Sequence, residues 1–284
     1  MLLTWGSSRP RPILDKAGRV FAVLAGRPRD ATGWADVTAR AQAAFEKARA
    51  EYRFNPTQVS HRRGEYPIIG AGFSYGGGQT RPSQMAHSDV NEPVVHTLLQ
   101  DPAVVRLAGF ARSAFQLYAP RLYGYYKKAM DILTKDGKLR RNFEKDIFAG
   151  VTFNLGPQVA TYVHTDSLNL PAGWCAVIAL GDFDPKEGGH LLLWDLKLII
   201  EFPPGALIFI PSAVLRHSNT VVSPEEHRYS FTQYSAGGLF RWVECGCKSK
   251  KVFDAEGGDL GVTGGERWLR GVQMWSTWEE LQGM

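Results

Sequence analysis

Two histidines and one aspartate stand in an order that suits a metal ion. His164 and Asp166 form an H-x-D tripeptide, and His217 follows within the sequence LRHS. Two imidazoles and one carboxylate are the ligands with which proteins hold non-haem Fe(II) while leaving positions open for a co-substrate and O₂. An H-x-D tripeptide also occurs in surface turns and caps without any metal. The order of the three residues and the strands predicted around them favour the metal.

The strands predicted around the tripeptide would position these ligands. β-branched and aromatic residues over 158–166 favour a strand, whose alternation puts Tyr162, His164 and Asp166 on one face. Short apolar segments bounded by Gly, Pro or Asp predict further strands at 174–180, 190–194, 198–202 and 206–211. Such a run of antiparallel strands over 148–244 predicts a double-sheet jelly roll with the ligands at one mouth.

Arg228 shares one face of the last predicted strand with Ser230, Thr232 and Tyr234. Its planar guanidinium offers a fork of donors that matches a carboxylate better than a lysine does. The R-x-S pattern of Arg228 and Ser230 resembles the signature by which 2-oxoglutarate oxygenases hold the distal carboxylate of that keto acid. This resemblance implies Fe(II), 2-oxoglutarate as co-substrate, and O₂. The alternative is a metal-free jelly roll.

A narrower resemblance covers most of the chain and is densest from 148 to 244. The stretch GGHLLLWDL at 188–196, continued by FPPG at 202–205 and YSFTQYSAGG at 229–238, resembles the fungal branch of the TET/JBP family. These enzymes are Fe(II)/2-oxoglutarate-dependent dioxygenases that oxidise methyl groups on DNA bases. The resemblance implies side-chain ligands for the iron and for both ends of the co-substrate. They are His164, Asp166 and His217 for iron, Arg228 and Ser230 for the distal carboxylate, and His190 for the iron-side carboxylate.

Asn169 and Tyr234 match family positions that face the substrate. By the resemblance, Asn169 contacts a base flipped out of double-stranded DNA, and Tyr234 stacks on that base. Ala236 stands where animal members carry a further base-contacting histidine, which leaves both 5-methylcytosine and N6-methyladenine open as the methylated base. Each assignment has a structural alternative. Asn169 suits a turn, Tyr234 suits sheet packing, and His190 suits a buried core position.

The first half of the chain is predicted to be helical and basic. Apolar periodicity favours helices over 33–53, 92–100, 102–117 and 119–134, with another near 265–282. Residues 1–150 hold 23 Lys and Arg against 13 Asp and Glu, whereas residues 151–284 hold 10 against 15. We expect an α+β fold with N-terminal helices buttressing the jelly roll. A basic excess suits the DNA backbone, although basic surfaces are common without nucleic acid.

We expect residues 1–284 to form a single catalytic domain. In this division 1–147 is a mainly helical, DNA-facing support, 148–244 is the jelly-roll core, and 245–284 is a C-terminal extension with a helix. Hydrophobic residues make up 44% of the 284, which is enough for a large core.

A glycine-rich segment at 72–81 is predicted to form a mobile loop, because three consecutive glycines at 76–78 disfavour helix and strand. Our hypothesis is that this loop enters the duplex, where Gln79 or Tyr75 fills the space left by the flipped base. Arg62, Arg63 and Arg81 would then contact phosphates. The alternative is a surface loop without a ligand.

The composition disfavours a membrane span and a disulfide framework. No apolar run approaches the roughly 20 residues needed to cross a bilayer, and the first residues lack the apolar stretch of a signal peptide. Cysteine occurs three times, as Cys175, Cys245 and Cys247, and such a sparse, odd set favours a reducing compartment. Cys245 and Cys247 leave a zinc site as a minor alternative.

The expected activity is oxidation of 5-methylcytosine in DNA to its 5-hydroxymethyl, 5-formyl and 5-carboxyl forms, with demethylation of N6-methyladenine as a further reaction. Double-stranded DNA with a flipped methylated base is the expected partner. A monomer is the expected state and the nucleus the expected location. Two other classes stay open: a 2-oxoglutarate-dependent hydroxylase of a protein or small molecule, and a catalytically inactive DNA-binding module. The inactive module would tolerate loss of the metal ligands, which are all present here.

Overall fold

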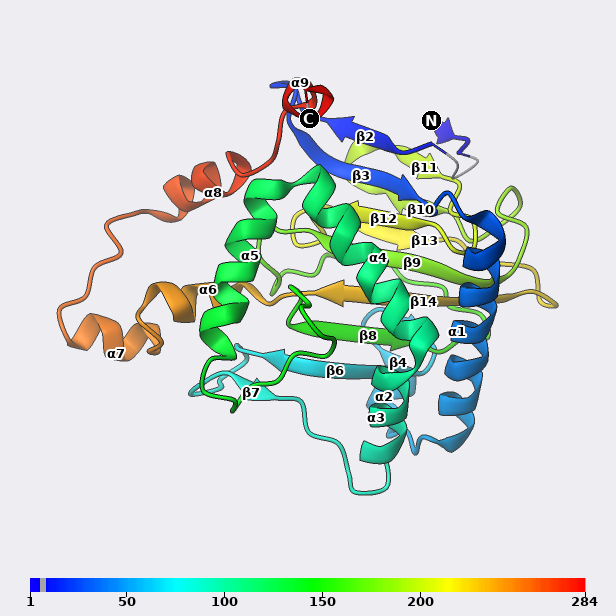
Figure 1. Ribbon diagram of the computed structural model, residues 1–284, viewed down its shortest axis with the longest axis horizontal. Coiled ribbons are helices and arrows are strands. Elements are labelled where there is room, and N and C mark those ends of the chain that lie inside the picture. The colour runs from blue at the N-terminus through cyan, green and yellow to red at the C-terminus, as the bar shows by residue number, and fades with distance from the viewer. Residues whose placement is uncertain (6–8, 284) are drawn as a thin grey trace.

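An eight-stranded antiparallel sheet forms the centre of the molecule (Figure 1). The computed structural model describes residues 1–5 and 9–283. In order across this major sheet the strands are β2 (Arg11–Leu14), β3 (Val20–Gly26), β12 (Leu207–Ile210), β9 (Cys175–Asp182), β14 (His227–Tyr234), β8 (Gly150–Asn154), β6 (Ile68–Ser74) and β7 (Ser83–Gln84). The predicted strands at 174–180 and 206–211 are therefore confirmed as β9 and β12.

A smaller sheet of four strands completes the jelly roll. Its order is β1 (Leu2–Leu3), β11 (Leu198–Ile200), β10 (Leu191–Leu193) and β13 (His217–Asn219), with the short 3-10 helix η1 (Trp194–Leu196) between β10 and β11. A separate hairpin joins β4 (Ser60–His61) to β5 (Gly64–Glu65). Together with the helices, the two main sheets confirm the predicted α+β fold with a jelly-roll core.

Four helices cover one face of the major sheet (Figure 1). They are α1 (Ala31–Glu51), α3 (Glu92–Gln100), α4 (Pro102–Tyr118) and α5 (Pro120–Leu133), as predicted; a short α2 (Pro56–Val59) precedes β4. Phe115 of α4 joins the layers, because its ring lies 5.3 to 5.5 Å from the rings of Phe148, Trp174 and Phe209. No helix in the described ranges has both the length and the apolar character needed to cross a bilayer.

Strand alternation decides which side chains face the helices. In β14 the odd positions Tyr229 and Phe231 point to the helical side, where the Tyr229 hydroxyl donates to Glu46 of α1 at 2.9 Å. The even positions Arg228 and Ser230 line a cavity on the other side. The helices therefore support the sheet from behind and leave its opposite face to the functional residues.

The C-terminal segment contains several short helices rather than one long one. These are α6 (Gly237–Glu244), α7 (Lys250–Ala255), α8 (Gly264–Val272) and α9 (Trp278–Gln282). The helix predicted near 265–282 is thus wrong as a continuous element. Thr277 begins α9 by accepting from the Glu280 amide at 3.2 Å, and the Ser276 carbonyl accepts from Val20 of β3 at 2.8 Å. The Ser276 carbonyl is thus used by the sheet, and Thr277 caps a new helix with its side chain, so no continuous helix passes through 276–277.

Two sequence-based assignments need correction. Residues 158–166 form no strand; they lie in an extended segment with isolated bridges at Gln158 and His164. The division at residue 148 is also too sharp, because β2, β3, β6 and β7 of the major sheet come from the first half. β3 is buried along its whole length, so it lacks the alternation that marks a half-exposed strand. β6 contains glycines, which disfavour a strand, and the loop predicted at 72–81 therefore includes its last three residues.

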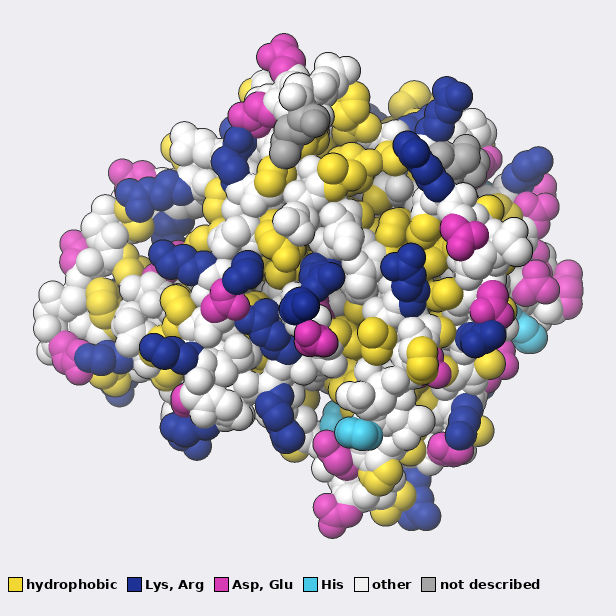
Figure 2. Space-filling view, viewed as in Figure 1, with side chains coloured by type: hydrophobic (Ala, Val, Ile, Leu, Met, Phe, Trp, Pro, Cys, Tyr) yellow, Lys and Arg dark blue, Asp and Glu magenta, His cyan; other side chains and the backbone are white. Residues whose placement is uncertain are grey.

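The helix-covered face carries charges of both signs. Figure 2 shows Lys and Arg side chains spread over this face among Asp and Glu, without a single basic patch. Several basic side chains pair with acids on the same helix, as Arg40 does with Asp36 and Lys127 with Asp131. These pairs engage some of the basic side chains, while the net excess of basic over acidic residues in 1–150 remains.

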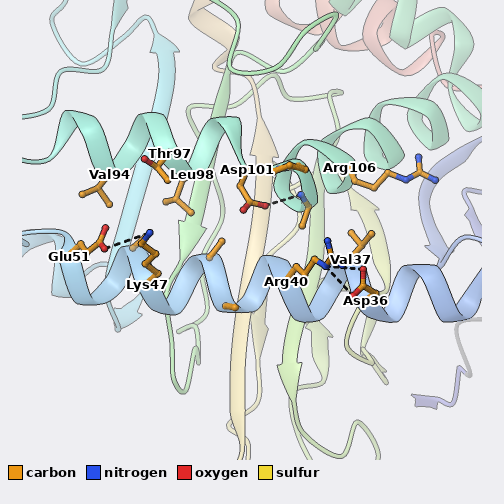
Figure 3. A pocket seen from close by; sticks show the side chains of 15 residues that line it. Asp36, Val37, Arg40, Lys47, Glu51, Val94, Thr97, Leu98, Asp101 and Arg106 are labelled. Atoms are coloured by element: carbon orange, nitrogen blue, oxygen red, sulfur yellow. Dashed lines mark hydrogen bonds and ion pairs between the residues drawn. The ribbon is translucent and has the colours of Figure 1, made fainter.

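A cavity of about 630 Å³ lies between α1 and the pair α3 and α4 (Figure 3). Val37, Val94 and Leu98 provide part of its apolar lining, and the Lys47–Glu51 ion pair lies on its wall at 4.0 Å. Its lining residues include none of the predicted site residues, so it lies apart from the predicted chemistry.

Gly181 of β9 pairs with Arg228 of β14 and lies directly against the β14 backbone, which leaves no space for a side chain. Its φ is +123°, and an added Cβ would lie 2.0 Å from the His227 carbonyl oxygen and 3.0 Å from the Arg228 Cα. We expect Gly181→Ala to lower the free energy of unfolding by more than about 2 kcal/mol, because it combines a strained φ with a backbone clash. Denaturant unfolding measures this change.

Gly109→Ala in α4 is the matched control. An added Cβ there meets nothing within 4 Å, so the substitution should stabilise the protein by about 0.5 to 1 kcal/mol through higher helix propensity. Equal unfolding free energies for the two variants would contradict this account of Gly181.

Candidate metal centre

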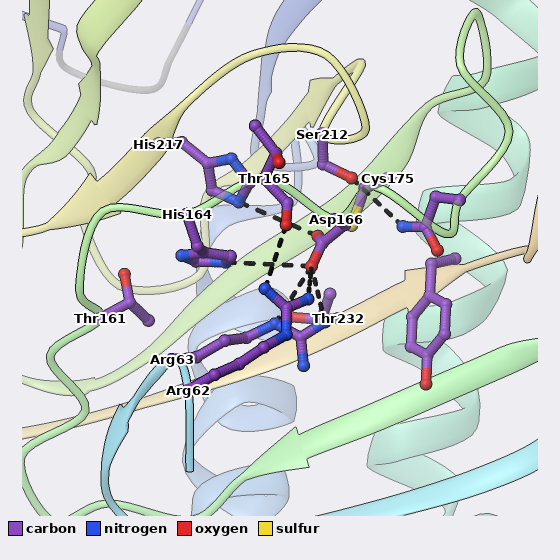
Figure 4. A network of polar contacts seen from close by, with 12 residues as sticks. Arg62, Arg63, Thr161, His164, Thr165, Asp166, Cys175, Ser212, His217 and Thr232 are labelled. Atoms are coloured by element: carbon purple, nitrogen blue, oxygen red, sulfur yellow. Dashed lines mark hydrogen bonds and ion pairs between the residues drawn. The ribbon is translucent and has the colours of Figure 1, made fainter. Parts of the chain in front are cut away.

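His164, Asp166 and His217 come together as the sequence predicts. The His164 Nε2 lies 3.9 Å from Asp166 Oδ1, and the His217 Nε2 lies 3.9 Å from Asp166 Oδ2. The three potential ligand atoms all lie within 4.8 Å of one another (Figure 4). Within the described ranges this is the one group of three or more such side chains, so Cys245 and Cys247 belong to no comparable cluster.

The two histidines are fixed through their backbones. The His164 amide donates to the His217 carbonyl at 3.0 Å, and the His217 amide donates back to the His164 carbonyl at 2.9 Å. Their rings lie side by side with centroids 4.3 Å apart. This reciprocal pair places both imidazoles at one mouth of the jelly roll, although 158–166 is not a strand.

The ring nitrogens are also oriented. The Nδ1 atom of His164 lies 2.7 Å from the Tyr162 carbonyl oxygen, and that of His217 lies 2.8 Å from the Leu215 carbonyl oxygen. Because a carbonyl only accepts, both Nδ1 atoms carry the hydrogen and both Nε2 atoms present a lone pair. Burial lowers the pKa of His164 to about 4 and also lowers the pKa of His217. Both rings are therefore neutral near pH 7, as metal ligands must be.

Arg63 binds the aspartate of the triad. Its Nε and Nη2 donate to Asp166 Oδ1 at 3.0 and 2.6 Å (Figure 4). The Tyr162 amide donates to the Arg63 carbonyl at 2.8 Å. Burial by itself would raise the pKa of Asp166, but the Arg63 guanidinium outweighs it and the pKa is lowered. The carboxylate is thus held ionised, with Oδ2 left on the His217 side.

This contact places the Arg63 guanidinium on the candidate iron ligand, and its role toward DNA phosphates stays a prediction. Arg62 lies farther from the carboxylate. Its Nη1 donates to the Thr165 carbonyl at 3.1 Å, its Nη2 lies 3.6 Å from Asp166 Oδ1, and its side chain is 56% exposed against 37% for Arg63. Arg81 is exposed in the turn between β6 and β7 and forms no ion pair with a described residue.

The triad opens into a cavity of about 90 Å³. Its polar lining comes from both sheets, from the β4–β5 hairpin and from the 158–169 segment: His61, Arg63, Tyr66, Thr152, Asn154, Thr161, His164, Asp166, Asn169, His217, Asn219, Arg228, Ser230, Thr232 and Tyr234. Asn219 could have been found from the sequence, because it lies two residues after His217 on the same face of a short strand. Tyr66 gave no such signal, because the hairpin that carries it is placed by long-range contacts.

Arg228 is a buried cation that lacks a carboxylate partner within the described ranges. The residue is 2% exposed, its Nη1 donates to the Val159 carbonyl at 3.2 Å, and its Nε has no hydrogen-bond acceptor among the described residues. The rings of Phe183 and Phe202 lie 5.9 Å from the guanidinium carbon. Burial lowers its pKa to about 10.

A buried charge is costly unless it is paired, so an anion bound in the cavity would stabilise this guanidinium. Ser230 lies on the same face of β14, and its Oγ accepts from Asn154 Nδ2 at 2.8 Å, which leaves the hydroxyl proton free to donate. A fork of N–H donors beside a hydroxyl fits the distal carboxylate of 2-oxoglutarate. The residues present therefore fit Fe(II) at the triad, with 2-oxoglutarate and O₂ as co-substrates.

His190 does not reach this cavity. Its neighbour Leu191 belongs to the lining, and strand alternation directs the adjacent side chain away from that face. The His190 Nε2 is buried without a hydrogen-bond partner in the described ranges. The geometry thus gives no support to His190 as the residue that holds the iron-side carboxylate.

Asn169 and Tyr234 lie in the cavity wall together. Asn169 Nδ2 donates to Ser212 Oγ at 3.3 Å, and the Tyr234 hydroxyl lies 3.4 Å from Thr152 Oγ1. A backbone bridge joins Asn169 to Ala236, two residues after Tyr234. The roles of Asn169 and Tyr234 toward a substrate stay predictions.

Tyr75 and Gln79 do not line the cavity. Gln79 closes its own turn, because its Oε1 accepts from the Gly76 amide at 3.0 Å and its Nε2 donates to Ser83 Oγ at 2.6 Å. Tyr75 packs edge-on against Trp242 with ring centroids 5.1 Å apart. The segment after β6 is thus a closed hairpin turn, and it does not bring these side chains to the triad.

No protein-family model and no curated protein matches this sequence. The fold is similar to that of NgTET1 in complex with 5mC DNA, with a TM-score of 0.59 and 11% identity over 83% of this chain and 82% of that chain. An oxidoreductase of the 2OG-Fe(II) oxygenase family from Burkholderia pseudomallei gives a TM-score of 0.36 and 17% identity over 72% of this chain and 90% of that one.

A prolyl-4-hydroxylase from Pseudomonas putida gives a TM-score of 0.35 and 17% identity, over 70% of this chain and 86% of that chain. At such identities a likeness concerns the fold alone. The fold of a TET-type protein, expected from the sequence, is therefore confirmed by the similarity to NgTET1, whereas nothing here distinguishes a fungal branch.

The Arg63–Asp166 contact generates a prediction about metal affinity. We expect Arg63→Ala to weaken Mn(II) or anaerobic Fe(II) binding by about tenfold, because partners that orient a ligand typically contribute that much or more. Calorimetric titration measures the affinity. Arg62→Ala is the matched control, since Arg62 lies 3.6 Å from Asp166 Oδ1, and its effect should be smaller. Unchanged or tighter metal binding by Arg63→Ala would contradict an orienting role. It would show that the positive charge of Arg63 acts only by repelling the metal ion.

Proposed function

We propose that this protein is an Fe(II)/2-oxoglutarate-dependent dioxygenase that oxidises methylated bases in DNA. The observation that carries the proposal is one cavity that joins the His164–Asp166–His217 triad to the unpaired Arg228 guanidinium. A metal site and a carboxylate site in one enclosed space are the two requirements of this enzyme class. The DNA substrate is supported by the similarity of fold to NgTET1, which is described in complex with 5mC DNA.

Each part of the site has a defined task in this proposal. The triad would hold Fe(II), and Arg228 with Ser230 would hold the distal carboxylate of 2-oxoglutarate. Bound iron, 2-oxoglutarate and O₂ would supply the oxidising chemistry that converts a methyl C–H bond to C–OH. Asn169 and Tyr234 would hold the base in the cavity, the first through an edge hydrogen bond and the second by stacking.

A base in a duplex cannot reach this recessed site without leaving the stack. Flipping costs about a few kcal/mol, which contacts in the pocket must offset. In the proposal, 5-methylcytosine passes through 5-hydroxymethyl to 5-formyl and 5-carboxyl forms. Ala236, a small residue bridged to Asn169, leaves room for N6-methyladenine as a second base; its N6-hydroxymethyl group would be released as formaldehyde, which leaves adenine. We also propose that the protein acts as a monomer and that it is located in the nucleus.

A hydroxylase of a protein or small molecule would use the same triad and the same Arg228. The mixed charges on the helix-covered face do not separate it from a DNA enzyme. Arg62 favours DNA, because it is a partly exposed cation beside the HxD segment. An inactive DNA-binding module would have no need of three correctly oriented metal ligands.

Mass spectrometry of nucleosides tests the proposal directly. Incubation with methylated duplex oligonucleotides, Fe(II) and 2-oxoglutarate should yield 5-hydroxymethylcytosine and its higher oxidation products. His164→Ala, Asp166→Ala and His217→Ala should each abolish turnover, because loss of one ligand breaks the site. Full activity in any of these variants would refute the iron assignment. Turnover of 2-oxoglutarate without oxidation of either methylated base, in duplex or single-stranded form, would refute DNA as the substrate.

A further inference from the structure

Exposed apolar residues flank the metal ligands His164 and Asp166 in the sequence. Tyr162 and Val163 immediately precede His164, Leu168 follows Asp166 by two residues, and all three are exposed. Scattered apolar residues on a surface are ordinary, but a group next to the ligands of one site indicates an interaction surface.

Leu168 is the most exposed of these residues, at 71%, and its backbone is fixed. The Asn169 amide donates to the Asp166 carbonyl at 2.8 Å, which closes the turn that carries Leu168. The Gly237 amide donates to the Leu168 carbonyl at 2.8 Å, which ties the turn to the start of α6. A large apolar side chain is thus held out into solvent by a rigid turn.

The next residue along the chain lines the cavity. Asn169 belongs to the cavity wall, so Leu168 stands at the boundary between that wall and the solvent. Arg62 reaches the same turn from the β4–β5 hairpin, because its Nη1 donates to the Thr165 carbonyl. An exposed apolar residue therefore belongs to the segment that carries Asp166 and the cavity-lining Asn169, and a partly exposed cation contacts that segment.

From this arrangement we infer that Leu168 is an apolar wedge that enters the base stack where the target base has left it. The inference rests on the proposed function and deepens it. Proteins that distort duplexes insert leucine and similar side chains between bases, because such residues replace part of the lost stacking. Arg62 is positioned to contact a phosphate on the adjacent backbone. The wedge is thus Leu168, and not Gln79 or Tyr75, whose side chains are engaged in their own turn and against Trp242.

A wedge is needed only where a stack must be opened. Leu168→Ala should therefore lower oxidation of a methylated base in duplex DNA by tenfold or more, while oxidation of the same sequence as a single strand changes by less than twofold. Leu168→Met should keep most of the duplex rate, because methionine has a similar volume and is also apolar. Leu117→Ala is the matched control: Leu117 is a 57% exposed leucine on α4, on the helix-covered side, and its loss should affect neither substrate.

A measurement without turnover separates flipping from chemistry. The duplex for this measurement carries 2-aminopurine beside the target base. With Mn(II) in place of Fe(II), binding of the intact protein should raise the fluorescence of the 2-aminopurine. Leu168→Ala should lose most of this rise at saturating protein. A variant that retains the full rise, or that loses duplex and single-strand activity equally, would overturn the wedge. Wild-type protein that oxidises neither form of DNA would instead refute the proposed function, and the wedge with it.

Discussion

The reciprocal backbone pair between His164 and His217 is the interaction on which the candidate site depends. Two amide–carbonyl hydrogen bonds join an irregular segment to the short strand β13 and set the two imidazoles side by side. The contacts that orient the two rings and the Asp166 carboxylate require that these backbones be held together. Each ring is oriented by a carbonyl two residues before it, and the Asp166 carboxylate reaches both rings. Loss of the pair would separate ligands that lie far apart in the sequence.

The jelly roll adds a second constraint through alternation along β14. Odd-numbered side chains bind the helical layer, and even-numbered ones line the cavity, so the helices stabilise the sheet without entering the site. Arg228 is placed in this way on a dry face, where burial leaves its charge without a carboxylate within the described ranges. Burying the Arg228 charge is unfavourable unless an anion pairs with it, and the cavity therefore favours an anionic ligand.

Local patterns predicted some of this arrangement and long-range contacts decided the rest. The ligand triad, the face shared by Arg228 and Ser230, and the helices α1, α3, α4 and α5 all follow from residue type and period. The strand predicted at 158–166 failed, because the amides of Tyr162 and His164 donate to Arg63 and His217 rather than to one neighbouring strand.

Arg63 illustrates the limit most clearly. It lies 103 residues from Asp166 in the sequence, and nothing in its neighbourhood distinguishes it from Arg62, yet only Arg63 donates hydrogen bonds to that carboxylate, whereas Arg62 lies 3.6 Å away. His190 shows a second limit, since it lies just before β10 and is absent from the cavity lining, so its role toward the co-substrate stays a prediction. Alternation placed Arg228 and Ser230 correctly in β14 but failed at 158–166, and the family resemblance named Asn169 and Tyr234, which both lie in the cavity wall.

The account claims that one cavity holds a metal ion and the far carboxylate of 2-oxoglutarate together. Anaerobic calorimetry of 2-oxoglutarate binding, with and without Fe(II), tests this claim most directly. The account predicts at least tenfold tighter binding with Fe(II), equivalent to about 1.4 kcal/mol, because the metal and Arg228 then hold opposite ends of one ligand. Arg228→Lys should weaken binding in both conditions, since a point charge replaces the fork. Equal affinity with and without the metal would contradict the account.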